Sequence, residues 1–413
     1  MTMLPPPAST SDPKSFGYST VQERWPKIIK GCIDDVSDHP ELIPQFEKIL
    51  QSIEQDLKII KFTDEEIALN PNLKFYNDNF VDVHWHNGPW LYLECYIYQA
   101  INNIFLKANL PHYDIFNRLK QSTLQSSEVG ITELCKKLSS LTLDTKDSDK
   151  LVLFKEFIDI SLWGNSTDLS LLAGDVSLED IKSIQGEEIR KKNEKNILVN
   201  DTKAIFEHLT ARSSSGIVDI ILDNSGFELF SDLVLAIFLL ESKLCSKVNF
   251  HCKQIPWFVS DTMIKDFDEL FFEISKFHNK HVDKFIENIK AYLAADKMAV
   301  VTDPYWTMSG PFWDLAKFPV YETLKSSKLL IFKGDLNYRK LTGDLNWERT
   351  TSFAEAIQDL KNANLPIVSL RTCKADVVVG LPEGVDERLV KEAGDFWSAS
   401  GKYAVISFFN PRQ

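Results

Sequence analysis

Short apolar runs that alternate with amphipathic segments are the strongest constraint on the fold of the second half of the chain. The runs are rich in β-branched side chains, which favour strands, and the longer segments between them, such as residues 262–277, favour helices. Strands that alternate with helices build a sheet covered on both faces. We therefore predict an α/β fold with strands at residues 216–222, 247–251, 298–302, 328–332, 366–370, 376–379 and 403–408.

The first half of the chain shows helical periodicity instead. Residues 90–107, which follow Pro89, form the longest apolar stretch of this kind. The opening residues contain several prolines and no periodic apolar pattern, which is typical of disorder. These features predict three parts. They are a disordered leader at 1–17, an all-helical N-terminal subdomain at 18–195 and an α/β catalytic domain at 196–413.

Composition excludes several classes of partner. Lys and Arg total 46 and Asp and Glu total 59, a net charge of −13, whereas a nucleic-acid surface needs positive charge. The longest uninterrupted apolar run, residues 233–240, is far shorter than the ~20 residues that span a bilayer. The chain opens without a signal-peptide pattern, and its six cysteines form no CxxC pair. We expect a cytoplasmic protein, or one shared with the nucleus, that binds neither nucleic acid nor membranes; no protein partner is indicated.

Polar side chains collect where the predicted strands end. The first of these strands stops abruptly at Asp223 and Asn224, and the run after the second leads to Asp261. Later strands lead into "KGDLNYRK", residues 333–340, and "RTCK", residues 371–374. In an open α/β sheet, ligands bind just beyond the carboxyl ends of the strands. The sequence therefore predicts that carboxylates and cations meet at one edge of the sheet.

The acidic part of this set suits a divalent cation. Asp223, Asn224 and Asp261 offer only oxygen ligands, which Mg²⁺ and Mn²⁺ prefer and Zn²⁺ does not. An alternative is that Asp223 and Asn224 merely cap a helix that begins near Phe227. Four other strand ends carry matching chemistry, at Asp261, Asp303, residues 333–340 and residues 371–374, so we favour a binding site over a cap.

The basic part of the set suits a phosphate. Lys333, Arg339 and Lys374 can neutralise a phosphoryl group, and an arginine can bind it through two N–H groups. Cys373 stands beside Lys374, but a nucleophilic cysteine needs a partner histidine and none is near it in sequence. We expect Cys373 to be a small buried side chain.

Longer motifs in the chain resemble those of one known family. They occur in the order "DNSGFELFSDL", "IPWFVSDT", "KGDLNYRKL" and "RTCKADVVVGL", and the last begins with an RTxK pattern. In this they are similar to the damage-control phosphatases of subfamily III, and "WLYLECYIY" and "LWGNSTDLSLL" extend the resemblance to nearly the whole chain after the leader. The resemblance implies a metal-dependent phosphatase on a Rossmann-like α/β/α three-layer sandwich, preceded by a helical region.

The resemblance also implies a set of site residues. The metal ligands would be Asp223, Asn224 and Asp261, holding Mn²⁺, Mg²⁺, Co²⁺ or Ni²⁺. The substrate would be a small sugar phosphate of the fructose 1-phosphate or fructose 6-phosphate type, hydrolysed by a metal-activated water with Lys374 stabilising the phosphoryl group. Asp335 or Glu228 would orient the water or bind sugar hydroxyls. The implied substrate contacts are Glu228, Asp335, Leu336, Asn337, Tyr338, Arg339 and Lys374.

Two other functions stay open. One family member has been described as a protein-glutamate carboxyl methyltransferase that uses S-adenosylmethionine, although no GxGxxG-like loop follows a predicted strand here. A non-catalytic sugar-phosphate sensor would need the cations but not the three metal ligands. One further segment is ambiguous, because Trp163, Gly164, Asn165 and Asp168 either border the pocket or end a helix.

Overall fold

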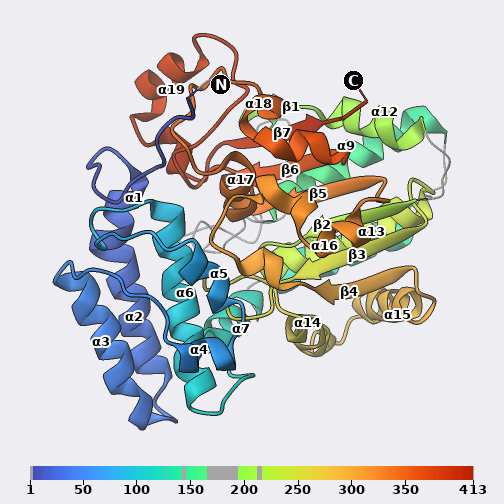
Figure 1. Ribbon diagram of the computed structural model, residues 1–413. Coiled ribbons are helices and arrows are strands. Elements are labelled where there is room, and N and C mark those ends of the chain that lie inside the picture. The colour runs from blue at the N-terminus through green and yellow to red at the C-terminus, as the bar shows by residue number, and fades with distance from the viewer. Residues whose placement is uncertain (1–2, 126, 142–145, 165–193, 212–215, 413) are drawn as a thin grey trace.

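The computed structural model describes residues 3–125, 127–141, 146–164, 194–211 and 216–412 (Figure 1). One seven-stranded sheet forms its centre, with strand order β1-β7-β6-β5-β2-β3-β4. The strands are β1 (Ile197–Asn200), β2 (Ile217–Ile221), β3 (Lys247–Cys252), β4 (Met298–Thr302), β5 (Leu329–Lys333), β6 (Ile367–Thr372) and β7 (Ala404–Phe409). The five strands β2 to β6 are parallel, whereas β7 is antiparallel to β6 and parallel to β1.

Six of the seven predicted strands are confirmed, and one is wrong. Val377, Val378 and Val379 are buried, but the backbone of residues 376–379 does not join the sheet. The Val379 N–H donates to the Tyr338 hydroxyl at 3.0 Å, and the Val377 carbonyl accepts from the Arg371 guanidinium. The short strand β1, which follows a charged stretch, was not predicted.

Helices cover both faces of the sheet, so the α/β/α three-layer prediction is confirmed (Figure 1). Along β5, Leu329 and Ile331 join the core on one face while Leu330 and Phe332 join the core on the other, as the alternation of a strand requires. The first face is covered by α7 (Asn117–Gln125), α8 (Glu128–Ser140), α9 (Asp147–Trp163), α12 (Thr202–Thr210), α13 (Phe227–Glu241), α14 (Lys265–Ser275) and α15 (Lys280–Ala294). The second is covered by α16 (Val320–Leu324), α17 (Gly334–Thr342), α18 (Phe353–Ala356), α19 (Val385–Ala393) and the short helices η3 (Pro304–Thr307), η4 (Phe312–Lys317), η5 (Gln358–Ala363) and η6 (Trp397–Ala399).

A separate helical unit precedes this sandwich, drawn in blue and cyan in Figure 1. Its long helix α6 (Trp90–Lys107) is buried on almost every side, which explains why its sequence is so apolar. The segments that follow β3, β5 and β6 contribute Trp257, Leu336 and Ala375 to the same hydrophobic core as this unit. The remaining elements of the unit are α1 (Phe16–Ser19), η1 (Thr20–Arg24), α2 (Trp25–Asp35), η2 (Pro40–Leu42), α3 (Ile43–Glu54), α4 (Asp64–Leu69) and α5 (Leu73–Asp78).

Two of the predicted domain limits need correction. The leader is not disordered over residues 3–17, because Ala8 and Thr10 are buried and the Ala8 N–H donates to the Asp344 carbonyl at 2.8 Å. The helical unit also ends well before residue 195. Helices α7 to α9 contribute Leu124, Phe154 and other side chains to the core of the sandwich. The leader was mispredicted because its contacts are with residues distant along the chain, such as Asp344, which its own composition does not show. The limit of the helical unit was mispredicted because periodicity shows that a helix has an apolar face, but not which neighbour covers that face.

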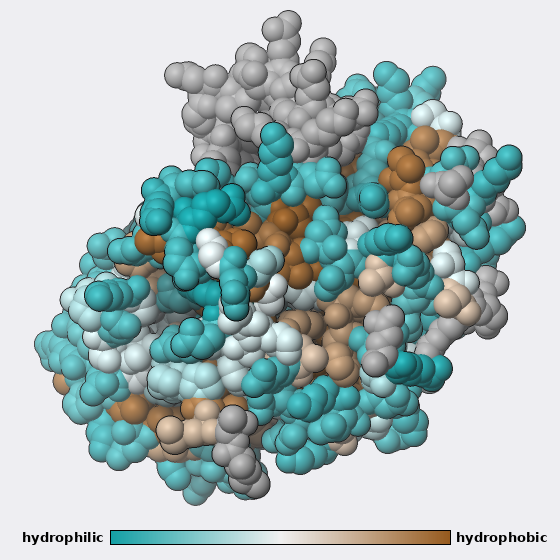
Figure 2. All heavy atoms as spheres, turned by 90° about the horizontal axis from the view of Figure 1, so that it is seen from above, coloured by the Kyte–Doolittle hydropathy of each residue, from teal (hydrophilic) through white to brown (hydrophobic). Residues whose placement is uncertain are grey.

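The surface seen from above is mixed. Figure 2 shows hydrophobic residues in separate patches among hydrophilic ones on this face. No helix within the described ranges is long and apolar enough to cross a membrane.

Candidate functional site

A cavity of about 680 Å³ lies where the helical unit meets the carboxyl edge of the sheet. It gathers side chains that follow four strands, since Asp223 follows β2, Asp261 follows β3, Asp335 follows β5 and Lys374 follows β6. The predicted convergence at one edge is therefore present. The full lining is Arg24, Lys27, Ile28, Trp90, Glu94, Leu119, Lys120, Gly164, Asp223, Asn224, Ser225, Phe227, Glu228, Phe258, Val259, Ser260, Asp261, Asp335, Leu336, Arg339 and Lys374.

Asn224 joins the side chains of the acidic end of the cavity, by which we mean Asp223, Asn224, Glu228 and Asp261. Its Nδ2 donates to Asp223 Oδ2 at 2.9 Å and to Glu228 Oε2 at 2.8 Å, and its Oδ1 accepts from the Ser260 hydroxyl. Backbone bonds join the same two loops, since the Thr262 N–H donates to the Asp223 carbonyl at 2.7 Å. Asp223, Asn224, Glu228 and Asp261 thus form one compact group, which a mere helix cap would not need.

A glycine lets α17 approach this group. Gly334 has φ +80°, and a Cβ atom there would lie 1.8 Å from Asp223 Oδ2. Any other side chain would have to displace the carboxylate, because contacts this short do not occur between nonbonded atoms. The Asp223 side chain is therefore fixed between its own strand and the start of α17.

Buried negative charge dominates the electrostatics of the acidic end. Burial, and after it the neighbouring carboxylates of Glu228 and Asp261, raise the pKa of Asp223 well above its usual value. Burial also raises the pKa of Asp261 to about 6, although the Lys253 ammonium lies 3.1 Å from its Oδ2. Both directions mean that the group is short of positive charge, which a bound cation would supply.

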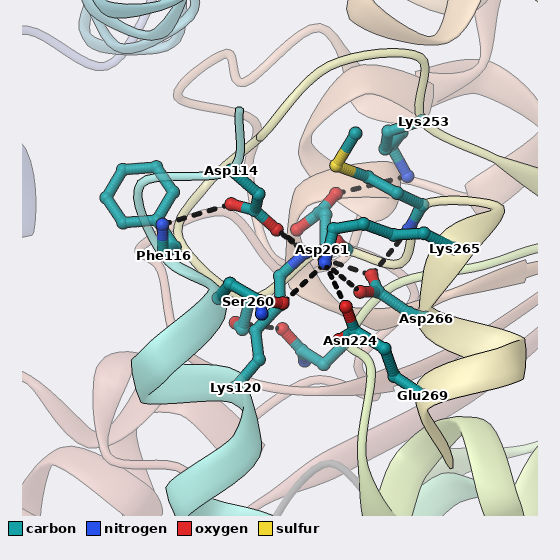
Figure 3. A network of polar contacts seen from close by, with 12 residues as sticks. Asp114, Phe116, Lys120, Asn224, Lys253, Ser260, Asp261, Lys265, Asp266 and Glu269 are labelled. Carbon is teal, nitrogen blue, oxygen red and sulfur yellow. Dashed lines mark hydrogen bonds and ion pairs between the residues drawn. The ribbon is translucent and has the colours of Figure 1, made fainter. Parts of the chain in front are cut away.

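The loop that carries Asp261 is anchored by buried lysines. Lys120 donates to the Asp261 carbonyl oxygen and to Asp266 Oδ2, both at 2.9 Å, and lies 3.1 Å from Asp114 Oδ2. Lys253 binds the Asp261 carboxylate and donates to the Leu222 carbonyl at 2.6 Å. Figure 3 shows how this network surrounds Asp261. Lys120 therefore holds the backbone of Asp261, and Lys253 holds its side chain.

The RTxK motif has two separate roles. Arg371 is fully buried, and its Nε donates to Asp335 Oδ1 at 2.8 Å while its Nη2 donates to the Ala375 carbonyl at 3.0 Å. The backbone N–H of Lys374 donates to the same Asp335 oxygen at 2.9 Å. Arg371 therefore shapes the turn and fixes Asp335, and Lys374 lines the cavity as a result.

Two of the predicted phosphate-binding cations are already paired. Lys333 lies outside the cavity lining, 2.9 Å from Asp232 and 3.5 Å from Glu228. Arg339 does line the cavity, but its guanidinium donates to both Asp344 oxygens, at 3.1 and 2.9 Å, and to Glu94 at 2.7 Å. Because these carboxylates balance its charge, Arg339 supports the cavity wall, and its contact with a phosphate stays a prediction.

Two predicted substrate contacts point elsewhere. The Asn337 side chain donates to the Lys333 carbonyl at 2.7 Å and to the Leu222 carbonyl at 3.2 Å, and the Tyr338 hydroxyl accepts from Val379. Neither side chain lines the cavity, whereas Leu336 and Asp335 do. Successive helical residues face different directions, so the whole "DLNYR" segment cannot face one ligand.

Cys373 is fully buried, and burial raises its pKa to about 11. The thiol stays protonated near neutral pH, as expected of a packing residue. Of the segment that was predicted either to border the pocket or to end a helix, Gly164 lines the cavity and Trp163 does not. Asn165 and Asp168 lie outside the described residues.

Comparison with known proteins now identifies the family. The Damage-control phosphatase ARMT1-like domain matches residues 20–389. Damage-control phosphatase ARMT1 of Bos taurus is 34% identical to this chain, over 99% of the chain and 100% of that protein. The protein of the same name from Homo sapiens is 32% identical, with 100% of both chains covered. The chain belongs to the damage-control phosphatase family.

Membership of the damage-control phosphatase family supports a phosphatase with a role in metabolite repair. Among solved structures, a DUF89 family protein from Pyrococcus horikoshii aligns over 94% of this chain and 97% of its own, with a TM-score of 0.48 and 15% identity.

Sequence reasoning missed the part of the cavity that the helical unit contributes. In this damage-control phosphatase, Arg24, Lys27, Trp90, Glu94 and Lys120 all line the cavity. The spacing of these residues in the sequence indicates that they lie on helices, but it does not indicate that they line a cavity. One signal was present, because Arg24 and Lys27 flank the apolar face that starts at Trp25, but nothing local shows that this side of α2 meets the sheet edge.

Proposed function

We propose that this protein is a metal-dependent phosphomonoesterase that hydrolyses small sugar phosphates of the fructose 1-phosphate or fructose 6-phosphate type. The observation that carries the proposal is one cavity with buried Asp223, Asp261 and Glu228 at one end and Lys374 on its wall. Family membership agrees with a phosphatase. A phosphate ester is negatively charged, so the carboxylates of the cavity would repel it if they were not neutralised. A bound cation would remove this repulsion and bind the phosphate.

The residues present fit a hard divalent cation such as Mn²⁺, Mg²⁺, Co²⁺ or Ni²⁺. Asp223, Asn224 and Asp261 provide oxygen ligands. Glu228 Oε1 is buried and makes no hydrogen bond to a described residue, although the Lys333 ammonium lies 3.5 Å away. When bound, such a cation neutralises phosphoryl charge and lowers the pKa of a bound water. Glu228 and Ser260 would keep the Asn224 amide oriented for this task.

The remaining residues act on the substrate directly. Lys374 places an ammonium in the cavity, where it stabilises charge on the phosphoryl oxygens. Asp335, fixed by Arg371 and by the Lys374 N–H, presents a carboxylate that accepts a hydrogen bond from the attacking water or from a sugar hydroxyl. Water adds to phosphorus as the ester oxygen leaves, so the products are inorganic phosphate and the free sugar.

The test is phosphate release from a panel of phosphometabolites, with each cation compared against EDTA. Asp223→Ala and Asp261→Ala should abolish release and weaken Mn²⁺ binding measured by calorimetry. Asp268→Ala removes an exposed carboxylate of α14 and is the matched control, which should leave both quantities unchanged.

Two results would reject the proposal. One is near wild-type turnover by either aspartate variant in saturating Mn²⁺. The other is tight S-adenosylmethionine binding with no phosphate released from any compound, which would favour the methyltransferase. Sugar-phosphate binding without turnover under every metal would favour the sensor.

A further inference from the structure

Two cations of the helical unit, Arg24 and Lys27, border the cavity. Arg24 closes η1 and Lys27 lies in the first turn of α2, and both side chains are exposed and line the cavity. Neither has a hydrogen-bond or ion-pair partner within the described part of the chain. Lys30, one turn further along α2, is different, because it pairs with Glu54 at 3.1 Å and lies outside the lining.

The backbone that carries this pair is firmly placed. Trp25, between the two cations, is fully buried and packs edge-on against Trp85 at 5.9 Å. The turn before it, η1, is a π-helical turn, a deviation that is frequent at functional sites. Arg24 and Lys27 therefore project from a rigid surface, and only their side chains need to be ordered when an anion binds.

Of the other cations that line the cavity, Lys374 is assigned to the phosphoryl group at the acidic end, and Arg339 and Lys120 are bound to carboxylates of the protein. Arg339 is bound to Glu94 and Asp344, and Lys120 to Asp114 and Asp266. In a chain with net charge −13, two cations that face a cavity and pair with no described residue create a local site for a negative group. Because Asp223 and Asp261 are buried whereas Arg24 and Lys27 are exposed, this site lies at the mouth and the acidic group lies deeper.

The size of the cavity points the same way. A volume of about 680 Å³ exceeds the need of a single phosphoryl group and falls within the range of pockets that enclose a whole small ligand. A ligand that reaches from the acidic end to the mouth would meet a proposed cation site at one end and Arg24 and Lys27 at the other.

We propose that Arg24 and Lys27 form a second anion-binding subsite, which binds the distal phosphoryl group of a sugar bisphosphate while the other phosphoryl group lies at the acidic end. The inference rests on the proposed function, because it assigns a substrate class to the same cavity. The subsite contributes binding to substrate and transition state alike, so its loss should raise KM and leave kcat unchanged.

The experiment compares fructose 1-phosphate with fructose 1,6-bisphosphate. Wild-type protein should have the lower KM for the bisphosphate. Arg24→Ala/Lys27→Ala should raise that KM about tenfold or more, because two charge-assisted contacts are lost, and should change KM for the monophosphate less than about twofold. Lys30→Ala removes one charge from the same helix and should alter neither value.

The outcomes separate the two proposals. Equal effects of the double variant on both substrates, or no effect on either, would overturn the subsite while leaving the phosphatase intact. If wild-type protein releases no phosphate from either compound, the proposed function fails. Calorimetry with the same two compounds then still tests the subsite, which requires tighter bisphosphate binding that the double variant loses.

Discussion

Gly334→Ala should damage the candidate site by displacing one carboxylate. Gly334 begins α17 with φ +80°, and the added Cβ atom would lie 1.8 Å from Asp223 Oδ2 and 2.1 Å from Asp223 Cγ. Since nonbonded carbon and oxygen atoms normally stay more than about 3 Å apart, the carboxylate or the start of the helix must move by roughly 1 Å. Either movement separates Asp223 from Asn224 and Glu228.

Two terms set the loss of stability. An alanine in the left-handed region costs about 1–2 kcal/mol, and overpacking a filled site costs about 1–3 kcal/mol. The free energy of unfolding should therefore fall by about 2–5 kcal/mol. A displacement of roughly 1 Å at a reacting centre should lower kcat/KM by about a hundredfold.

Gly384→Ala separates these two terms. Gly384 has a nearly equal φ of +78°, but a Cβ atom there would meet nothing within 4 Å. This variant reports the backbone strain alone, so the difference in unfolding free energy between the two variants measures the clash with Asp223. Urea denaturation gives both free energies, calorimetry gives the Mn²⁺ affinity, and phosphate release gives kcat/KM.

The reasoning is refuted if Gly334→Ala matches Gly384→Ala in stability and retains wild-type Mn²⁺ affinity and kcat/KM. That outcome would mean that Asp223 can leave its observed position without consequence. Loss of stability with full activity would have the same meaning for the site.

Two further predictions concern the loop after β6. Lys374→Ala should lower kcat/KM by about 30- to 1,000-fold, because one contact to developing phosphoryl charge is lost, and Lys374→Arg should recover only part of this loss. Cys373→Ser is the control and should keep the wild-type kcat/KM. A large loss of activity in Cys373→Ser would show that the cysteine is more than a packing residue. Burial raises the pKa of Asp376 to about 6. The free energy of unfolding is therefore highest below the pKa that Asp376 has in the unfolded chain, and it falls as the pH rises to about 6. Asp376→Asn removes this loss, so it should raise the free energy of unfolding at pH 7.5 by up to about 3 kcal/mol and leave it unchanged at pH 4. Equal urea midpoints of wild type and Asp376→Asn at pH 7.5 would contradict this, provided the bond from the Phe16 N–H persists.

The sequence alone determined the elements with the strongest local signals. Apolar β-branched runs such as those that became β2 and β5 must be buried, and polar residues directly after them must lie at the sheet edge. That reasoning placed Asp223, Asp261, Asp335 and Lys374 around one cavity from chain order alone. The residues of 376–379 show its limit, because burial without strand pairing has the same apolar pattern.

Only the tertiary structure decided which charged groups face a ligand. Lys333, Arg339 and Lys374 look equivalent in sequence, yet Lys333 lies outside the cavity and is bound to Asp232. Arg339 lines the cavity and is bound to Glu94 and Asp344, and Lys374 also lines it. Asp344 lies close to Arg339 in sequence, just beyond the end of α17. Asp232 and Glu94 are distant along the chain from the cations that they bind, so no local pattern reveals those two pairs. The same holds for Arg24 and Lys27, because their place at the cavity mouth depends on how the helical unit packs on the sheet. Local periodicity records that a side chain is buried or polar, whereas the choice of partner depends on contacts between distant segments.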